Sequence, residues 1–434
     1  MKKRCFSGWI AVLSVFLLPA VAFAGGFASN EQGAKASGMA NAFVAQADDP
    51  TAVYFNPAGI VQLDGTQVTL GVSPVMPGAT FESSTPAASD PGGFRGTSSG
   101  QKTDLDDDAV FIPNAYLTQK ISDRVSFGFG TYSNFGLETN WPDDWEGRFI
   151  VGGTKAELVT LSASPVLAFK PWERVSIAVG PVMQYLDFDL RRKTFTGGLA
   201  GEPEAKFTGD DVDWGWTTGL LVWLTEDIKV GATYRSRVSH RVNGKLEFGP
   251  QVPAIGLNNT NLTVNVTTPA NAYMGLAWTY GPLTLEFDFQ WTDWSDYDEL
   301  WPEFNNPVGP TGQTELVVEE DFNDAWAYRF GGQFTVTEYL DVRLGIAYDE
   351  SPVPDKSVSP RIPGGDRWIY SAGLGSHFKG FDADLAYQYV DAESTDLGDE
   401  GQDPVFEAGA AGPLTGKFKD VDAHIIAFNL TYRF

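Results

Sequence analysis

Cysteine and histidine are scarce in this chain, which has one cysteine and three histidines among 434 residues. Cys5 lies in a segment that we expect to be cleaved, so we expect neither disulfides nor thiol chemistry in the remainder. The histidines, His240, His377 and His424, lie far apart in the sequence and belong to no visible Ser/His/Asp set. We therefore predict that the protein is not an enzyme, and we expect no cofactor and no metal site.

Long apolar runs are also missing after the N-terminus, where no segment has the roughly 18 consecutive apolar residues of a membrane helix. The apolar stretch at residues 9–18 is too short to span a bilayer and follows three basic residues at positions 2–4. An A-x-A cleavage site follows at residues 22–24. We interpret residues 1–24 as a signal peptide for export. The alternative is an uncleaved anchor helix.

Basic residues are few, since 30 Lys and Arg stand against 56 Asp and Glu, for a formal net charge of −26. This balance argues against nucleic acid and against anionic membrane surfaces as partners. The acidic residues are concentrated in stretches that we interpret as loops, such as residues 104–108, 319–321 and 396–400. We expect these loops to be solvated and mutually repelling. The alternative is divalent cations that bridge their carboxylates to lipopolysaccharide.

Apolar and polar residues alternate through most of the chain from residue 66 onward. In the last segment, residues 422–434, every second residue is large and mostly apolar, and the chain ends on Phe434. We count fourteen such segments. The connections after the even-numbered ones are very short, such as Ser122-Asp123, whereas the others are long and rich in Gly, Pro, Asp and Asn. This pattern predicts an all-β fold, a fourteen-stranded antiparallel transmembrane β-barrel over residues 65–434, rather than a soluble sandwich.

The alternation also assigns faces to the predicted strands. In the ninth strand Leu285 and Phe287 share one face, whereas Glu286 and Asp288 share the other. A charge that faces lipid at mid-membrane costs roughly 2–4 kcal/mol, so the carboxylates must point into the lumen. Tryptophans near strand ends suit the aromatic girdles at the two membrane interfaces. These tryptophans are Trp172, Trp223, Trp278, Trp291, Trp294 and Trp368.

The segment before the first strand, residues 25–64, does not alternate and is rich in small residues. Residues 34–47 could form short helices, and the Asn56-Pro57 step predicts a turn. A compact piece in this position either hangs below the barrel or folds into its lumen. We predict a small, partly helical plug, because a barrel this wide would leave an aqueous channel if it were empty. A nonspecific porin needs no such segment.

Specific motifs in this segment and at the C-terminus connect the chain to a known family. They are G-F-A-S-N-E-Q at residues 26–32, D-D-P at residues 48–50, Y-F-N-P-A-G at residues 54–59 and the aromatic Phe434. With these motifs the chain resembles the FadL family of outer-membrane transporters for long-chain fatty acids and other hydrophobic compounds. The resemblance covers essentially the whole mature chain, although only the N-terminal segment and the C-terminus carry quotable motifs.

The resemblance implies a barrel that is closed by an N-terminal hatch, with a greasy pocket beside it. The hatch motif falls on Asn56, Pro57 and Ala58. Phe27 would lie close to the internal pocket, and the substrate would leave sideways where the third strand kinks inward. The kink would fall on Gly130, Asn134, Phe135 and Gly136. The alternative role for these glycines is ordinary barrel curvature.

A carboxylate ligand would favour an inward Arg or Lys in an otherwise apolar pocket. The inward candidates are Arg343, with Arg235 and Arg237 behind it. The alternative is that these cations pair with lumen carboxylates such as Asp341. Without a basic residue facing the ligand, neutral hydrocarbons would be favoured.

Capture at the outer surface is expected to depart from the family pattern. In the best-known members the third and fourth outer loops are long and build a hydrophobic groove, whereas here they are modest. The second outer loop instead contains Trp141, Trp145 and Phe149. We expect these aromatic residues to be exposed there.

We therefore predict a passive transporter in the outer membrane of a Gram-negative bacterium, which takes up long-chain fatty acids or similar hydrophobic molecules. The ligand would be held in a lumen pocket beside the hatch and released through the third strand. Alternatives are an uptake channel for neutral aromatic or aliphatic hydrocarbons, a nonspecific porin, and a structural or adhesive role. Besides the ligand, the expected partners are outer-membrane lipid and lipopolysaccharide, and the protein is expected to be a monomer.

Overall fold

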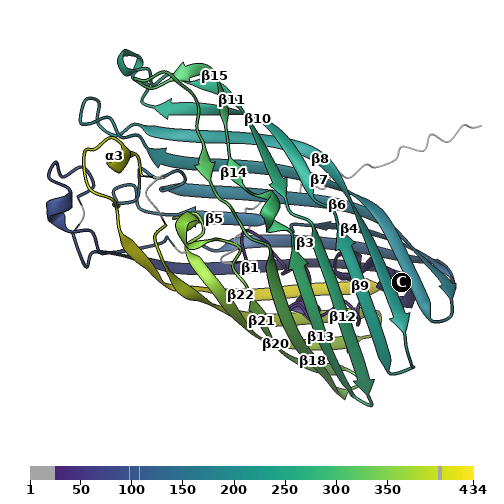
Figure 1. Ribbon diagram of the computed structural model, residues 1–434. Helices are drawn as coiled ribbons and strands as arrows, with labels where there is room; N and C mark the ends of the chain where they lie inside the picture. Colours follow the sequence, from purple (N-terminus) through teal and green to yellow (C-terminus); the bar gives the residue numbers. More distant parts are fainter. Residues whose placement is uncertain (1–24, 97, 107, 399–402) are drawn as a thin grey trace, which may run out of the picture.

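A computed structural model describes residues 25–96, 98–106, 108–398 and 403–434 (Figure 1). The predicted signal peptide, residues 1–24, lies outside the described residues. Within them, no helix is long and apolar enough to cross a membrane. The predicted fold class is confirmed, because the chain forms a closed antiparallel barrel of fourteen strands. The barrel closes where the first and last strands pair, from Gln67↔Arg433 to Ser83↔Gly416.

Eleven of the fourteen barrel strands are continuous and three are interrupted once. In chain order they are β1 Thr66–Ser83, β3 Val110–Ser122, β4 Val125–Tyr132 with β5 Gly136–Asn140, β6 Lys155–Trp172, β7 Val175–Lys193, β8 Glu204–Trp223, β9 Ile228–Arg235 with β10 Val238–Gly249, β11 Thr260–Thr268 with β12 Asn271–Tyr280, β13 Leu283–Thr292, β18 Ala325–Thr337, β19 Leu340–Asp349, β20 Gly364–Phe378, β21 Phe381–Asp396 and β22 Gly416–Arg433. Each pairs with its sequence neighbour, so the register follows from successive hairpins.

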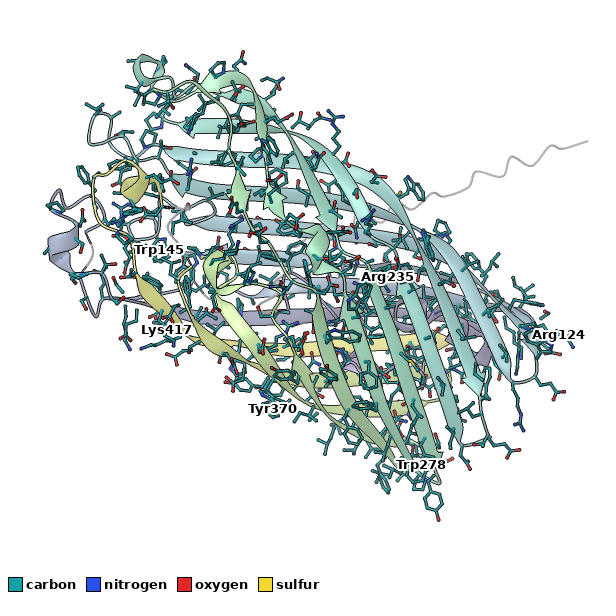
Figure 2. All side chains as sticks on the ribbon, viewed as in Figure 1. Arg124, Trp145, Arg235, Trp278, Tyr370 and Lys417 are labelled. Carbon is teal, nitrogen blue, oxygen red and sulfur yellow. The ribbon has the colours of Figure 1, made fainter. Side chains whose placement is uncertain are left out.

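The remaining elements are short. They are α1 Ala34–Ser37, α2 Ala52–Phe55, η1 Pro57–Gln62, η2 Ala87–Ser89, β2 Lys102–Asp104, η3 Pro253–Ile255, η4 Trp294–Asp296, β14 Glu299–Leu300, β15 Glu303–Val308, β16 Gln313–Glu315, β17 Val318–Glu319, η5 Asp355–Ser357 and α3 Pro404–Glu407. Most belong to the long connections, which gather at one end of the barrel, whereas the short turns lie at the other (Figure 1). Trp145 lies among the long connections and Arg124 near the short turns (Figure 2). By this asymmetry the long connections are extracellular.

Side-chain burial follows the predicted faces. On β13 the carboxylates of Glu286 and Asp288 are buried, whereas Phe287 and Phe289 are exposed on the outside of the barrel. Trp172, Trp278 and Trp368 are exposed as expected of girdle residues, and Figure 2 labels Trp278 near the short-turn end. The prediction for Trp294 was wrong, because its side chain is 1% exposed. It belongs to η4, which folds inward, so its ring packs inside the molecule.

The N-terminal segment, residues 25–64, is almost entirely buried and touches the inward faces of the barrel strands. Its loop at residues 43–46 is held by two carboxylates of β13. The backbone N–H groups of Phe43 and Val44 donate to Asp288, at 2.8 and 3.1 Å. Those of Ala45 and Gln46 donate to Glu286, at 2.6 and 2.8 Å. Four consecutive amides thus provide hydrogen-bond partners for Oδ2 of Asp288 and for both carboxylate oxygens of Glu286, which would be costly to bury without partners.

Inward glycines on the strands leave room for this segment. A Cβ added at Gly331 of β18 would lie 2.6 Å from Cβ of Met39 and 2.7 Å from its carbonyl oxygen. A Cβ at the next residue, Gly332, points outward and meets only the tip of Leu285, at 3.1 Å. Only hydrogen at Gly331 allows the backbone of the segment to approach the wall this closely.

Replacement of Gly331 by Val should therefore displace the N-terminal segment without opening the barrel. We expect single-channel conductance in planar bilayers to rise at least several-fold over the unmodified protein, because the lumen becomes water-filled. The matched control is Gly332→Val, whose side chain would enter lipid and should leave conductance unchanged. Heat-dependent gel migration verifies that both barrels are folded. Equal conductance of the two variants would contradict the assigned role of Gly331.

Candidate functional site

An apolar pocket lies on the extracellular side of the N-terminal segment. Its cavity volume is about 40 Å³, so side chains fill most of the space between its walls. The lining residues are mostly apolar: Phe27, Leu137, Leu158, Phe188, Leu190, Val266, Tyr297, Leu300, Glu320, Phe322, Ser357, Ser359, Arg361 and Ile362. The chemistry of this lining, apolar with a few polar groups, is typical of sites for small amphipathic ligands.

Phe27 occupies the floor of this pocket at the start of the N-terminal segment. Its ring is 1% exposed and makes edge-to-face contacts with Trp294 and Tyr297, with centroids 4.7 and 5.3 Å apart. It also meets Phe135 of the third strand at 5.9 Å. The structure thus brings Phe27 into the pocket and next to the predicted kink.

One buried ion pair stands in the pocket lining. Nη1 of Arg361 lies 2.6 Å from Oε1 of Glu320, and both side chains are at most 6% exposed. Both residues belong to long connections, before β20 and β18 respectively. Burial raises the pKa of the Glu320 carboxyl above its usual value, although the adjacent Arg361 charge and its hydrogen bond act in the opposite direction. The pair therefore places the Arg361 guanidinium, compensated by Glu320, beside apolar walls.

The second outer loop folds over this pair instead of extending into solvent. Trp141 and Trp145 are 3% and 2% exposed, and Phe149 is also buried, so the expectation of exposed aromatics was wrong. The two indoles stack with centroids 4.7 Å apart. Nε1 of Trp141 donates to the carbonyl of Pro360 at 3.0 Å, which fixes the backbone next to Arg361.

The third barrel strand is interrupted between β4 and β5, at residues 133–135. β3 pairs with β4 up to Ala115↔Thr131, whereas β5 pairs with β6 from Gly136↔Val159 to Asn140↔Lys155. The upper part of β3, residues 110–114, lies beyond its ladder with β4. At the top, the amide of Asp106 donates to the carbonyl of Asn140 at 2.9 Å. The barrel wall is therefore locally open in its backbone pairing between β3 and β5.

The N-terminal segment supplies backbone partners at this interruption. Ala28 forms an isolated antiparallel bridge with Phe135. The amide of Ser29 donates to the carbonyl of Asn134 at 3.0 Å, and the amide of Gly136 donates to the carbonyl of Phe27 at 2.8 Å. Gly136 is the first residue of β5. These bonds cover polar groups that neither membrane lipid nor a neighbouring strand satisfies.

Gly130 lies outside the interruption, within the regular pairing of β4, where it faces Tyr116 and Ser164. A Cβ at Gly130 would lie 2.9 Å from Cγ1 of Val53 in the N-terminal segment. Its small size thus allows close approach of that segment.

Asn56, Pro57 and Ala58 lie at the junction of α2 and η1, against the barrel wall. Nδ2 of Asn56 donates to the carbonyls of Val44 and Leu220, at 2.8 and 3.0 Å, and its Oδ1 accepts from the amide of Ala58. The Ala58 carbonyl accepts a hydrogen bond from Oγ of Ser176 on β7 at 2.9 Å. The asparagine therefore joins two parts of the N-terminal segment to β8.

Arg235 and Arg343 lie outside the lining of the apolar pocket. Arg235 donates to the carbonyl of Tyr54 at 2.8 Å, and its guanidinium lies 4.4 Å from the centre of the Tyr54 ring. Arg343 pairs with Asp384 at 2.7 Å and lines a charged cavity of about 670 Å³ that also contains Lys35. Arg235 thus binds the N-terminal segment, and Arg343 lies in the cavity at the short-turn end of the lumen.

Sequence reasoning missed Arg361 and Glu320, since both lie in long connections, and the stretch that contains Glu320 is predicted to be a solvated loop. The available signal was the S-P-R-I-P stretch at residues 359–363, in which Arg361 lies between a proline and an Ile-Pro pair. Its packing depends on Trp141 from a distant loop, which periodicity does not predict. Within the described residues no group of three or more His, Cys, Asp and Glu side chains could hold a metal ion.

Comparison with known proteins supports this architecture. The model of the outer membrane protein transport protein family (OMPP1/FadL/TodX) matches residues 15–434. A long-chain fatty acid transport protein of Escherichia coli O6:H1 is 27% identical over all of both chains. A putative outer membrane protein of Neisseria meningitidis serogroup B is 28% identical over 98% of each chain.

Solved structures agree in fold. The crystal structure of a Pseudomonas aeruginosa FadL homologue covers 94% of this chain and 100% of its own, at 20% identity and a TM-score of 0.79. The Ralstonia pickettii toluene transporter TbuX covers 93% and 98%, at 14% identity and a TM-score of 0.66. With the closed barrel and the match across nearly its whole length, the chain belongs to the OMPP1/FadL/TodX family of outer membrane transport proteins.

Proposed function

We propose that this protein is a passive transporter of long-chain fatty acids across the outer membrane. The observation that carries the proposal is the apolar pocket with a buried arginine, Arg361, beside an interruption of the barrel wall. The acyl chain contacts the apolar lining, and the carboxylate approaches Arg361. A single barrel contains the whole site, so a monomer is sufficient.

In this proposal residues 25–64 act as a hatch. They fill the lumen between the pocket and the charged cavity at the short-turn end, which makes axial passage of an acyl chain unfavourable. The interruption at residues 133–135 supports lateral release, because it borders Phe27 and pairs in part with the start of the hatch instead of with a barrel strand. A hydrophobic ligand gains free energy on leaving through the wall into lipid.

Neutral hydrocarbons are the second candidate ligands. The Glu320 carboxylate already compensates the charge of Arg361. An uncharged molecule can therefore enter the pocket without disturbing this ion pair. The structural neighbour TbuX is described as a toluene transporter, which also supports this candidate. The response to the charge at position 361 separates the two ligand classes.

Replacement of Arg361 by Gln should weaken binding of oleate and spare binding of toluene. A hydrogen bond to a charged group contributes about 1.5–3 kcal/mol, so the oleate Kd should rise roughly 10–100-fold. Isothermal titration calorimetry of the purified protein measures both. Arg361→Lys is the matched control and should retain much of the oleate affinity. If oleate affinity is unchanged in the Gln variant, Arg361 does not bind the carboxylate.

Oleate binding should strengthen as the pH falls from neutral. Burial raises the pKa of Glu320, so this carboxyl takes up a proton at a higher pH than an exposed glutamate. Protonated Glu320 no longer carries the negative charge that opposes an ionised ligand beside Arg361. The Kd for oleate should therefore decrease as the pH of the titration is lowered. Glu320→Gln should bind oleate more tightly at pH 7.5 and lose the pH dependence, and toluene binding should not change with pH.

Cross-linking of the hatch to the wall should block transport but not binding. Ala28 and Phe135 form a bridge pair without mutual hydrogen bonds, in which Cα atoms are about 4.5 Å apart, close enough for a disulfide. The oxidised Ala28→Cys/Phe135→Cys protein should take up oleate into cells at least fivefold more slowly than the same protein reduced. Its oleate Kd should be the same in both states. Equal uptake in both states would mean that this contact stays closed during transport.

A further inference from the structure

We infer that the barrel wall contains a second lateral opening, between β8 and β10, through which uncharged hydrophobic molecules reach the apolar pocket. The inference rests on the proposed role of that pocket. It concerns a part of the wall several strands away from the interruption between β4 and β5.

The backbone pairing of β8 is broken near the middle of the strand. β8 pairs with β9 up to Thr217↔Arg235 and pairs with β10 from Asp210↔Asn243 upward. Residues 211–216 of β8 lie between these two ladders. At the lower edge, the amide of Ser236 donates to the carbonyl of Trp216 at 2.9 Å. The amide of Trp214 turns to the Asp213 carboxylate at 2.7 Å instead of to a strand.

The neighbouring hairpin is interrupted at the same level on both of its strands. β9 ends at Arg235 and β10 begins at Val238, while β11 ends at Thr268 and β12 begins at Asn271. These four residues face one another, because Arg235 is opposite Asn271 and Val238 is opposite Thr268. The upper hairpin can therefore separate from β8 along residues 211–216 without breaking the ladders of the lower barrel.

A polar contact closes this part of the wall from the inside. The imidazole of His240 is hydrogen-bonded to Asp211 of β8 at 3.2 Å and to Gln184 of β7 at 3.1 Å. Nε2 of Gln184 in turn donates to Oδ1 of Asn134, at the interruption of the third strand, at 3.3 Å. His240 thus lies across the space between the two unpaired strand edges, and its side chain is fully buried.

The opening leads toward the apolar pocket. His240 is opposite Val266 in the ladder of β10 and β11, and Asp211 is opposite Leu186 in that of β7 and β8. Val266 itself lines the pocket, as does Phe188, two residues beyond Leu186. If the His240 imidazole rotates away, the outer surface and the pocket-lining residues are only one strand position apart.

The chemistry of the opening selects uncharged molecules. On the outer surface Val212, Trp214 and Trp216 are 51%, 59% and 47% exposed, which makes an apolar approach. On the inner side Asp211 and Asp213 carry negative charge, so a carboxylate ligand is repelled there. A neutral hydrocarbon is compatible with the apolar outer approach and is not repelled by the inner carboxylates. Fatty acids and neutral molecules would then enter the same pocket by different routes.

A disulfide across the opening tests the inference. A Cβ added at Gly215 would lie 2.9 Å from Cγ2 of Val238, so Gly215→Cys/Val238→Cys can join β8 to the upper hairpin. The matched control is Ser239→Cys/Thr267→Cys, which joins two opposed, exposed residues within the hairpin and leaves the opening free. Uptake of radiolabelled toluene and oleate is measured in intact cells before and after oxidation and again after reduction.

We expect oxidation of the first pair to lower toluene uptake at least fivefold, reversibly, with oleate uptake unchanged, and oxidation of the control to change neither. Toluene uptake that is equal in the oxidised and reduced states overturns the second opening. Arg361→Gln, assayed in parallel, tests the pocket separately: unchanged oleate uptake there would refute the fatty-acid site, whatever the disulfide shows.

A second variant serves if the cysteine pair does not fold or does not oxidise. His240→Leu keeps an apolar side chain of similar size but cannot bond to Asp211 or Gln184. It should raise toluene uptake at least twofold, because the contact that closes the opening is lost. Oleate uptake at the level of the unmodified protein verifies that the barrel is intact. Unchanged toluene uptake in this variant would also overturn the inference.

Discussion

Backbone hydrogen bonding governs this protein more than any single side chain. A barrel wall in lipid must pair every N–H and C=O group, since the hydrocarbon core offers no alternative partner. Closure of β1 onto β22 meets this demand around the circumference. Where the third strand is interrupted, Phe27 and Ser29 of the N-terminal segment supply the partners instead. The wall interruption and the segment in the lumen therefore share one set of backbone hydrogen bonds, which in the proposed function joins release and closure in one contact.

The same segment divides the lumen into two chemically different compartments. On one side lies the apolar pocket with the ion pair of Glu320 and Arg361. On the other lies the charged cavity that contains Lys35 and Arg343. Charges near the short turns are paired, as Arg343 is with Asp384, whereas aromatic rings pack in the lining of the pocket. In the proposed function, this difference between the compartments makes the wall the favourable exit for a hydrophobic molecule.

Charged residues illustrate how far sequence reasoning reaches in such a barrel. Alternation placed Glu286 and Asp288 correctly in the lumen, because period two leaves a side chain only two faces to occupy. It did not indicate that both carboxylates would bind the amides of residues 43–46. Arg343 and Arg235 were also correctly directed inward, but direction does not give height along the axis. The height of an inward side chain along the barrel axis decides whether it contacts the apolar pocket or the N-terminal segment below it.

The sequence by itself determined the strand number, the faces of the strands and the family, because these depend on local period, loop length and short motifs. Only the tertiary structure decided which loops fold inward. Trp141, Trp145 and Trp294 are buried, against expectation, since long connections from different parts of the chain pack on one another. The same packing positions Arg361 in the pocket. Such contacts join residues far apart in sequence, and neither alternation nor composition contains that information.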